Sequence, residues 1–134
     1  MARSTFHSTT RTLTKPAAQA HPDAALLLLM DEHTKTQARV DAAEIVLQAD
    51  PGILPDKAFY RLCDKVSDIE DAILATPTRT PDGLRIKARI AARYLQAPED
   101  WGWRAYDVFG RFVESILRQT ASGRSGTPHS NTRR

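Results

Sequence analysis

The sequence predicts an all-α protein, with an antiparallel, coiled-coil-like helical hairpin followed by two shorter helices. Apolar residues recur at alternating steps of three and four over most of the 134 residues, which is the period of an α-helix. Proline and glycine interrupt this period at a few points, and no segment alternates apolar and polar residues as a strand would. We expect a disordered basic arm over residues 1–21, a single helical domain over 22–121 and a disordered basic tail over 122–134.

The first helix is expected to begin near Pro22-Asp23 and to end near Ala49, where Asp50-Pro51-Gly52 favours a turn. Its seam has coiled-coil spacing and consists of Leu26, Leu29, His33, Thr36, Val40, Ala43 and Leu47. Because His33 and Thr36 dilute the middle of this seam, we expect it to be weak or partner-dependent, which favours a homo-oligomer.

The second helix is expected over about 55–76. Its seam has the same spacing without a polar interruption and consists of Phe59, Leu62, Val66, Ile69 and Ile73. Because the link Asp50–Leu54 is short, the two helices should fold back on each other as an antiparallel hairpin that spans 22–76.

A Thr/Pro-rich stretch predicts the boundary between the hairpin and a third helix over 81–97. Pro77 ends the second helix, Thr80 is expected to be the N-cap of the third, and Pro81 occupies its first position. This helix carries two apolar stripes, one of Leu84, Ala88, Ala91 and Leu95 and one of Ile86, Ile90 and Tyr94. Gly83 should let the helix pack closely against a neighbour.

The fourth helix is expected over 99–121 and should end before Ser122-Gly123. Its apolar stripe is Ala105, Phe109, Phe112 and Ile116, widened by Val108, Val113 and Leu117. Six of the nine aromatic residues fall between Tyr94 and Phe112, so we expect the main core in the second half of the chain. Gly102 and Gly110 should mark close helix packing or a delayed helix start.

The net charge of +3 is unevenly distributed. Residues 23–76 hold 11 acidic and 5 basic residues, residues 77–122 hold 8 basic and 5 acidic residues, and both chain ends carry basic residues only. The basic segments could contact nucleic acid, acidic lipids or an acidic partner. For the three arginines of the third helix, Arg85, Arg89 and Arg93, the acidic hairpin is the alternative, intramolecular partner.

The third helix carries a candidate basic face. Arg85, Arg89 and Arg93 line up at steps of four, and Arg79 precedes them. Phosphates or an acidic partner could bind these four side chains. The alternative function is therefore a nucleic-acid-binding accessory protein that uses the basic arms and this face.

No spacing typical of a zinc site, a nucleophile elbow or a phosphate-binding loop occurs in the sequence. We therefore expect no catalytic residue, no cofactor, no metal site and no small-molecule substrate. His33 on the first seam should be a packed, hydrogen-bonded residue, and the single cysteine, Cys63, a structural thiol. Asp64, Asp68 and Asp71 share a side of the second helix with interleaved basic residues and should form a solvated, charge-paired surface.

These features favour a non-catalytic helical interaction or adaptor protein that acts through protein–protein contacts with another protein or a second copy. Trp101, Trp103 and Tyr106 form a candidate interaction patch, because Trp and Tyr are enriched at binding hot spots; their alternative place is the core. The longest apolar run, Ala24–Met30, is far too short to cross a membrane. We expect a cytoplasmic protein without membrane contact.

The stretch Ile69–Arg89 (IEDAILATPTRTPDGLRIKAR) holds an amphipathic helix followed by a Thr-Pro-x-Thr-x-x-Gly-Leu-x-x-Lys-Ala-like turn. The turn positions are Thr76, Pro77, Thr78 or Thr80, Gly83, Leu84, Lys87 and Ala88. This motif, together with the start Pro22–Leu26, resembles small uncharacterised bacterial helical proteins of the prophage or mobile-element type. The resemblance covers about residues 22–97 and implies no particular activity.

Overall fold

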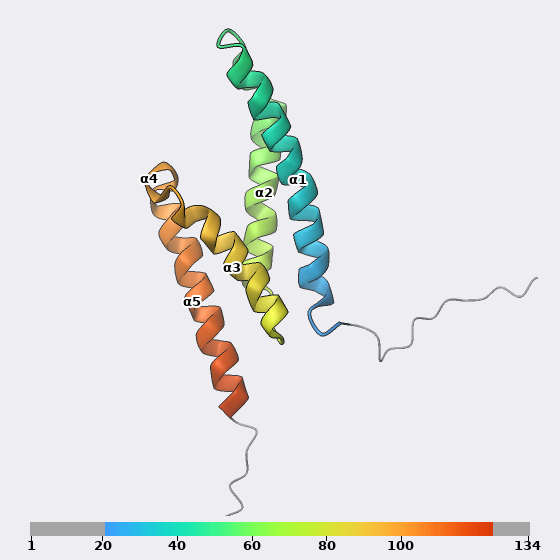
Figure 1. Cartoon of the computed structure of the whole chain (residues 1–134), viewed down its shortest axis with the longest axis vertical. Coiled ribbons are helices and arrows are strands. Elements are labelled where there is room, and N and C mark those ends of the chain that lie inside the picture. The colour runs from blue at the N-terminus through green and yellow to red at the C-terminus, as the bar shows by residue number, and fades with distance from the viewer. Residues whose placement is uncertain (1–20, 125–134) are drawn as a thin grey trace, which may run out of the picture.

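The computed structural model describes residues 21–124, and all regular structure in that range is helical. Its helices are α1 (Ala24–Ala49), α2 (Lys57–Ala75), α3 (Pro81–Leu95), α4 (Pro98–Trp101) and α5 (Trp103–Arg124). Figure 1 shows α1 and α2 as a long hairpin, with α3 at its base and α5 beside α3. The all-α prediction is confirmed, while nearly all of the expected basic arm and tail lie outside the described residues. Within residues 21–124, no helix is both long and apolar enough to cross a membrane.

The expected antiparallel hairpin forms, and both seams face its interior. Every residue of the two seams is buried or half-buried. The polar residues in the middle, His33 and Thr36, are each 3% exposed and have partners inside the chain. His33 contacts Glu70 of α2, and the Thr36 hydroxyl donates to the Glu32 carbonyl oxygen at 2.9 Å. The seam of α1 therefore pairs with α2, and its polar middle is satisfied without a second copy.

Side-chain caps set the starts of α2 and α3. The Asp56 carboxylate accepts a hydrogen bond from the Phe59 N–H at 2.9 Å, so α2 begins after this cap and later than the expected start at Pro55. The expected cap of α3 is confirmed, because Thr80 Oγ1 accepts from the Gly83 N–H at 3.2 Å.

The expected fourth helix is divided into α4 and α5 at Gly102. The φ angle of Gly102 is 53°, in the left-handed region that favours glycine, so the chain turns there. Gly110 does not mark close packing within the described chain, since a Cβ at that position would meet nothing within 4 Å. The backbone of α5 continues past the expected end at residue 121 and reaches Arg124.

The hydrophobic core lies where the base of the hairpin meets α3 and α5. Its buried members are Leu26, Ile69, Ile73, Leu74, Ile86, Ile90, Ala91, Tyr94, Ala105 and Val108. Six of these ten residues follow Pro77, as expected for a core mainly in the second half, and the other four belong to the hairpin. Tyr94 is the one fully buried aromatic residue among those described, whereas Trp103 and Tyr106 are 81% and 78% exposed.

Candidate functional site

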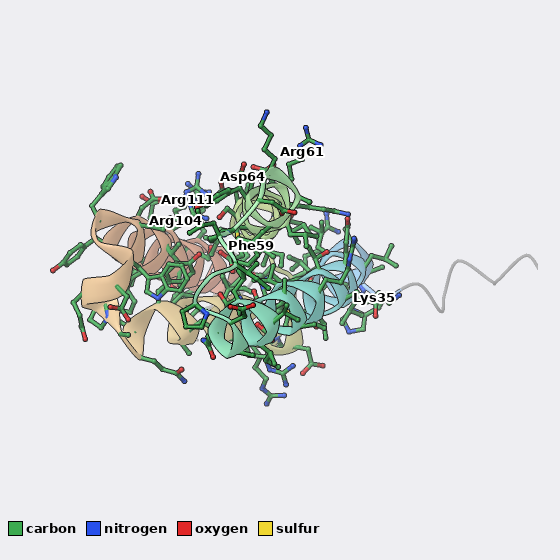
Figure 2. All side chains as sticks on the ribbon, turned by 90° about the horizontal axis from the view of Figure 1, so that it is seen from above. Lys35, Phe59, Arg61, Asp64, Arg104 and Arg111 are labelled. Carbon is green, nitrogen blue, oxygen red and sulfur yellow. The ribbon has the colours of Figure 1, made fainter. Side chains whose placement is uncertain are left out.

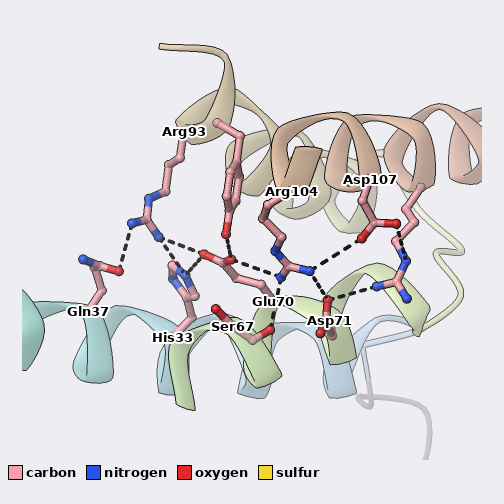
Figure 3. Close-up of polar contacts among 10 residues, drawn as sticks. His33, Gln37, Ser67, Glu70, Asp71, Arg93, Arg104 and Asp107 are labelled. Carbon is pink, nitrogen blue, oxygen red and sulfur yellow. Dashed lines mark hydrogen bonds and ion pairs between the residues drawn. The ribbon is translucent and has the colours of Figure 1, made fainter. Parts of the chain in front are cut away.

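A buried carboxylate joins four helices (Figure 3). Glu70 of α2 is 1% exposed. Its Oε1 lies 3.0 Å from His33 Nε2 on α1 and 3.0 Å from Arg93 Nη1 on α3. Its Oε2 accepts a hydrogen bond from the Tyr94 hydroxyl and lies 3.7 Å from Arg104 Nη2 on α5. We call these five residues the Glu70 network.

The network continues to the surface through a second carboxylate, Asp71. Arg104 donates to Asp71 Oδ1 at 2.8 Å, and Arg111 donates to the same oxygen at 3.0 Å. Burial, together with the contact to Glu70, raises the pKa of Tyr94 to about 12, although Arg104 opposes this shift. The acid-rich hairpin thus pairs with Arg104 and Arg111 of α5. Of the three arginines for which it was the alternative partner, Arg93 pairs with Glu70, whereas Arg85 pairs with Asp82 of its own helix.

The arginines of the candidate basic face point in different directions. Arg93 turns inward to the Glu70 network, whereas the side chains of Arg85 and Arg89 are exposed on α3. Arg79 is exposed in the turn that precedes this helix. These four residues therefore do not form one outward surface, and nucleic-acid binding stays a prediction.

A second buried carboxylate connects the start of α1 to the start of α3. Asp23 is 3% exposed, and its Oδ1 accepts a hydrogen bond from the Arg79 N–H at 2.9 Å. Its Oδ2 accepts from the Thr80 N–H at 3.0 Å and from the Thr80 hydroxyl at 2.5 Å. A Cβ at Gly83 would collide with this carboxylate, so the expected close packing at Gly83 is confirmed. We call this set of residues the Asp23 junction.

The Asp23 junction is expected to weaken in acid. Burial raises the pKa of Asp23, but hydrogen bonds from Thr80 and from the Arg79 backbone outweigh burial and hold the pKa below its usual value of 3.8. A carboxylate whose pKa falls on folding stabilises the fold above its unfolded-state pKa, and this contribution disappears as pH falls through the folded-state pKa. Asp23→Asn should therefore lower the free energy of unfolding near neutral pH and flatten its decline below about pH 4.

Urea denaturation at a series of pH values measures this effect. Asp68→Asn, at an exposed position of α2, is the control and should retain the wild-type pH profile. An Asp23→Asn profile parallel to the wild-type profile in acid would contradict the prediction.

The other polar residues that the sequence brings forward, Cys63 and the aspartates Asp64 and Asp71, lie on α2. Cys63 is half-buried, and burial with the nearby carboxylates of Glu44 and Asp64 raises the pKa of its thiol. Figure 2 shows Arg61 and Asp64 pointing outward from α2. Asp71 instead accepts a hydrogen bond from Arg104 of α5. In the part of the chain that the structure describes, no group of three or more His, Cys, Asp or Glu side chains could hold a metal ion.

One side of α5 carries an exposed apolar surface, which we call the outer face of α5. It consists of Trp103, Tyr106, Phe109, Val113 and Leu117. The opposite side of the helix, with Ala105 and Val108, is buried in the core. Two residues of the candidate patch, Trp103 and Tyr106, therefore lie on this face. The third, Trp101, packs edge-to-face on the Tyr94 ring, with centroids 5.0 Å apart.

Sequence reasoning missed both buried carboxylates. A signal for Glu70 was available, because Val66 and Ile73 of the apolar seam lie one helical turn before and after it. No comparable signal existed for Asp23, since its partners Arg79 and Thr80 are remote in sequence.

No protein-family model matches this chain, and no curated protein or solved structure matches it. The resemblance to small bacterial helical proteins therefore stays a prediction. The turn that carries the resemblance has a clear structural role. Thr76 Oγ1 donates to the Ala72 carbonyl oxygen at the end of α2, and Thr80 and Gly83 belong to the Asp23 junction.

Proposed function

We propose that this protein is a non-catalytic helical interaction protein that acts through protein–protein contacts at the outer face of α5. The observation that carries this proposal is that α5 is apolar on two sides and the described chain covers one of them. Trp103, Tyr106 and Leu117 are 81%, 78% and 63% exposed. A helix with apolar residues on both sides is typical of one buried between two neighbours, and a contiguous exposed apolar patch is typical of an interaction site.

The partner that fits this face best is a second copy of α5. Gly110 lies in the middle of the face, and no contact within the described structure explains the glycine. Glycine inside a helix costs about 1 kcal/mol relative to alanine, but it lets a crossing helix approach closely. If an antiparallel copy crosses there, Trp103, one heptad before Gly110, meets Leu117, one heptad after it. A large side chain then packs against a smaller one at both ends of the contact.

Leu117→Lys is expected to weaken self-association of the full chain by about tenfold or more, because a lysine ammonium would have to be buried between the helices. Analytical ultracentrifugation over a concentration series measures the dissociation constant. Leu117 is 63% exposed, so the substitution should change the free energy of unfolding by less than about 0.5 kcal/mol.

The matched control is Leu54→Lys at the tip of the hairpin, where the leucine is 80% exposed. This variant should associate as the wild type does. Loss of association in Leu54→Lys but not in Leu117→Lys would contradict the assignment to α5. A monomeric wild type at about 100 μM, together with crosslinking that captures no partner sensitive to Leu117→Lys, would contradict the proposed function as a whole. A captured partner that Leu117→Lys loses and Leu54→Lys retains would replace the second copy with another protein.

A further inference from the structure

Lys87 of α3 is buried without an acidic partner among the described residues. The residue is 2% exposed, and its Nζ donates to the Leu74 carbonyl oxygen and to Ser115 Oγ, each at 3.0 Å. Among residues 21–124, no carboxylate forms an ion pair with this ammonium. Fully buried lysines are rare unless paired, and an ammonium group has three N–H donors, one more than these two acceptors use.

A cavity of about 430 Å³ lies beside Lys87, between the end of α2 and the last turns of α5. Lys87 and Arg118 contribute two cations to its lining, and none of its described lining residues is acidic. Leu74, Pro77 and Ala121 supply an apolar wall. This volume and this mixture of an apolar wall with a few polar groups are typical of a small-molecule site.

The two cations act on each other. Burial and the charge of Arg118 lower the pKa of Lys87, while the charge of Asp23 opposes this shift. Arg118 pairs at 3.6 Å with Glu114, but both side chains of that pair are largely exposed, so water screens the contact. An anion between Lys87 and Arg118 would relieve their repulsion and provide the third acceptor for the ammonium.

We propose that this cavity binds a small organic anion, whose carboxylate or phosphate oxygens lie between Lys87 Nζ and the Arg118 guanidinium. The apolar body of the anion lies against Leu74 and Pro77. The hydrogen bond from Lys87 to the Leu74 carbonyl oxygen also caps the end of α2 and remains when the anion binds. None of these residues belongs to the outer face of α5, so this site is independent of the proposed protein–protein contact.

The test compares hexanoate, hexyl phosphate and uncharged hexanol by isothermal titration calorimetry on the full chain. One or both anions should bind at least about tenfold more tightly than hexanol, and the two anions distinguish a carboxylate ligand from a phosphate ligand. Lys87→Met removes the charge and should reduce the affinity for the anion to that for hexanol. Lys65→Met, at an exposed position of α2, is the matched control and should bind the anion as the wild type does.

Lys87→Met also removes a buried hydrogen-bonding group and so could prevent folding. A second variant that folds normally is therefore needed to test the site. Arg118 is 82% exposed at its side chain, so Arg118→Gln should fold normally and should bind the anion about three- to tenfold more weakly. Hexanoate should also raise the pKa of Lys87 in an NMR titration of the lysine side chains, because the anion stabilises the charged form. Equal wild-type affinities for the anions and hexanol, anion binding unchanged in both variants, or no anion binding at about 10 mM would overturn the proposal.

Discussion

Replacing Glu70 with glutamine is expected to lower the free energy of unfolding by about 3 kcal/mol or more. The amide keeps the shape of the side chain, but it has no charge, and its NH₂ group cannot accept hydrogen bonds from Tyr94 or Arg93. The Glu70 carboxylate is 1% exposed and contacts cations of α3 and α5. Removing one member of a buried ion pair costs about 3–5 kcal/mol, because the remaining charge stays in a poorly solvated site.

Urea denaturation, monitored by circular dichroism, measures the loss in the free energy of unfolding, and thermal denaturation measures the melting temperature. The melting temperature should fall by about 12 °C or more, since 1 kcal/mol corresponds to about 4–8 °C in a domain of this size. Glu114→Gln is the matched control, because its carboxylate is 64% exposed and pairs with Arg118 at 3.6 Å. The control should lose less than about 0.5 kcal/mol. If Glu70→Gln and Glu114→Gln lower the free energy of unfolding by similar amounts, burial does not determine how strongly the Glu70 network stabilises the fold.

Gly83→Ala is expected to lower the free energy of unfolding by about 2–3 kcal/mol. The new Cβ would collide with the Asp23 carboxylate, which three hydrogen bonds from Arg79 and Thr80 hold in place. Relieving the collision moves Asp23 and breaks hydrogen bonds to a charged group, each of which contributes about 1.5–3 kcal/mol.

Gly110→Ala is the matched control, with the opposite sign expected. A Cβ at Gly110 meets nothing within 4 Å, so alanine should raise the free energy of unfolding by about 0.5–1 kcal/mol through its higher helix propensity. In a double-mutant cycle, Gly83→Ala should lose most of its effect when Asp23 is already alanine. An undiminished effect in that background would show that the collision with Asp23 is not its cause.

The hairpin and the start of α3 could be predicted from the sequence because they depend on neighbours in the chain. The seam from Leu26 to Leu47 repeats at helical spacing, and burial followed that spacing even at the polar residues His33 and Thr36. The Thr80 cap is also local, because its acceptor oxygen and the Gly83 N–H lie within one helical turn.

The polar contacts that connect the helices could not be predicted from the sequence in the same way. Asp23 and Thr80 are separated in sequence by the whole hairpin, and Glu70 contacts donors from three other helices. A glutamate can lie on a solvated surface or in a buried network, and the residue type alone does not distinguish the two. Hydrophobic periodicity can therefore show at most that Glu70 lies near the apolar seam. The burial of Lys87 depends on the tertiary packing of α2 and α5, which bring the Leu74 carbonyl oxygen and Ser115 to its ammonium group.

The sequence by itself determined the four longer helices, the hairpin and the wide apolar surface of α5, since each of these depends on local spacing. Which side of α5 enters the core was decided by the tertiary structure alone. The small side chains of Ala105 and Val108 let α5 approach the core closely, whereas Trp103 and Tyr106 would hold the helices apart. Periodicity cannot choose between two apolar sides of one helix, because that choice depends on the shape of the surface on which the helix packs.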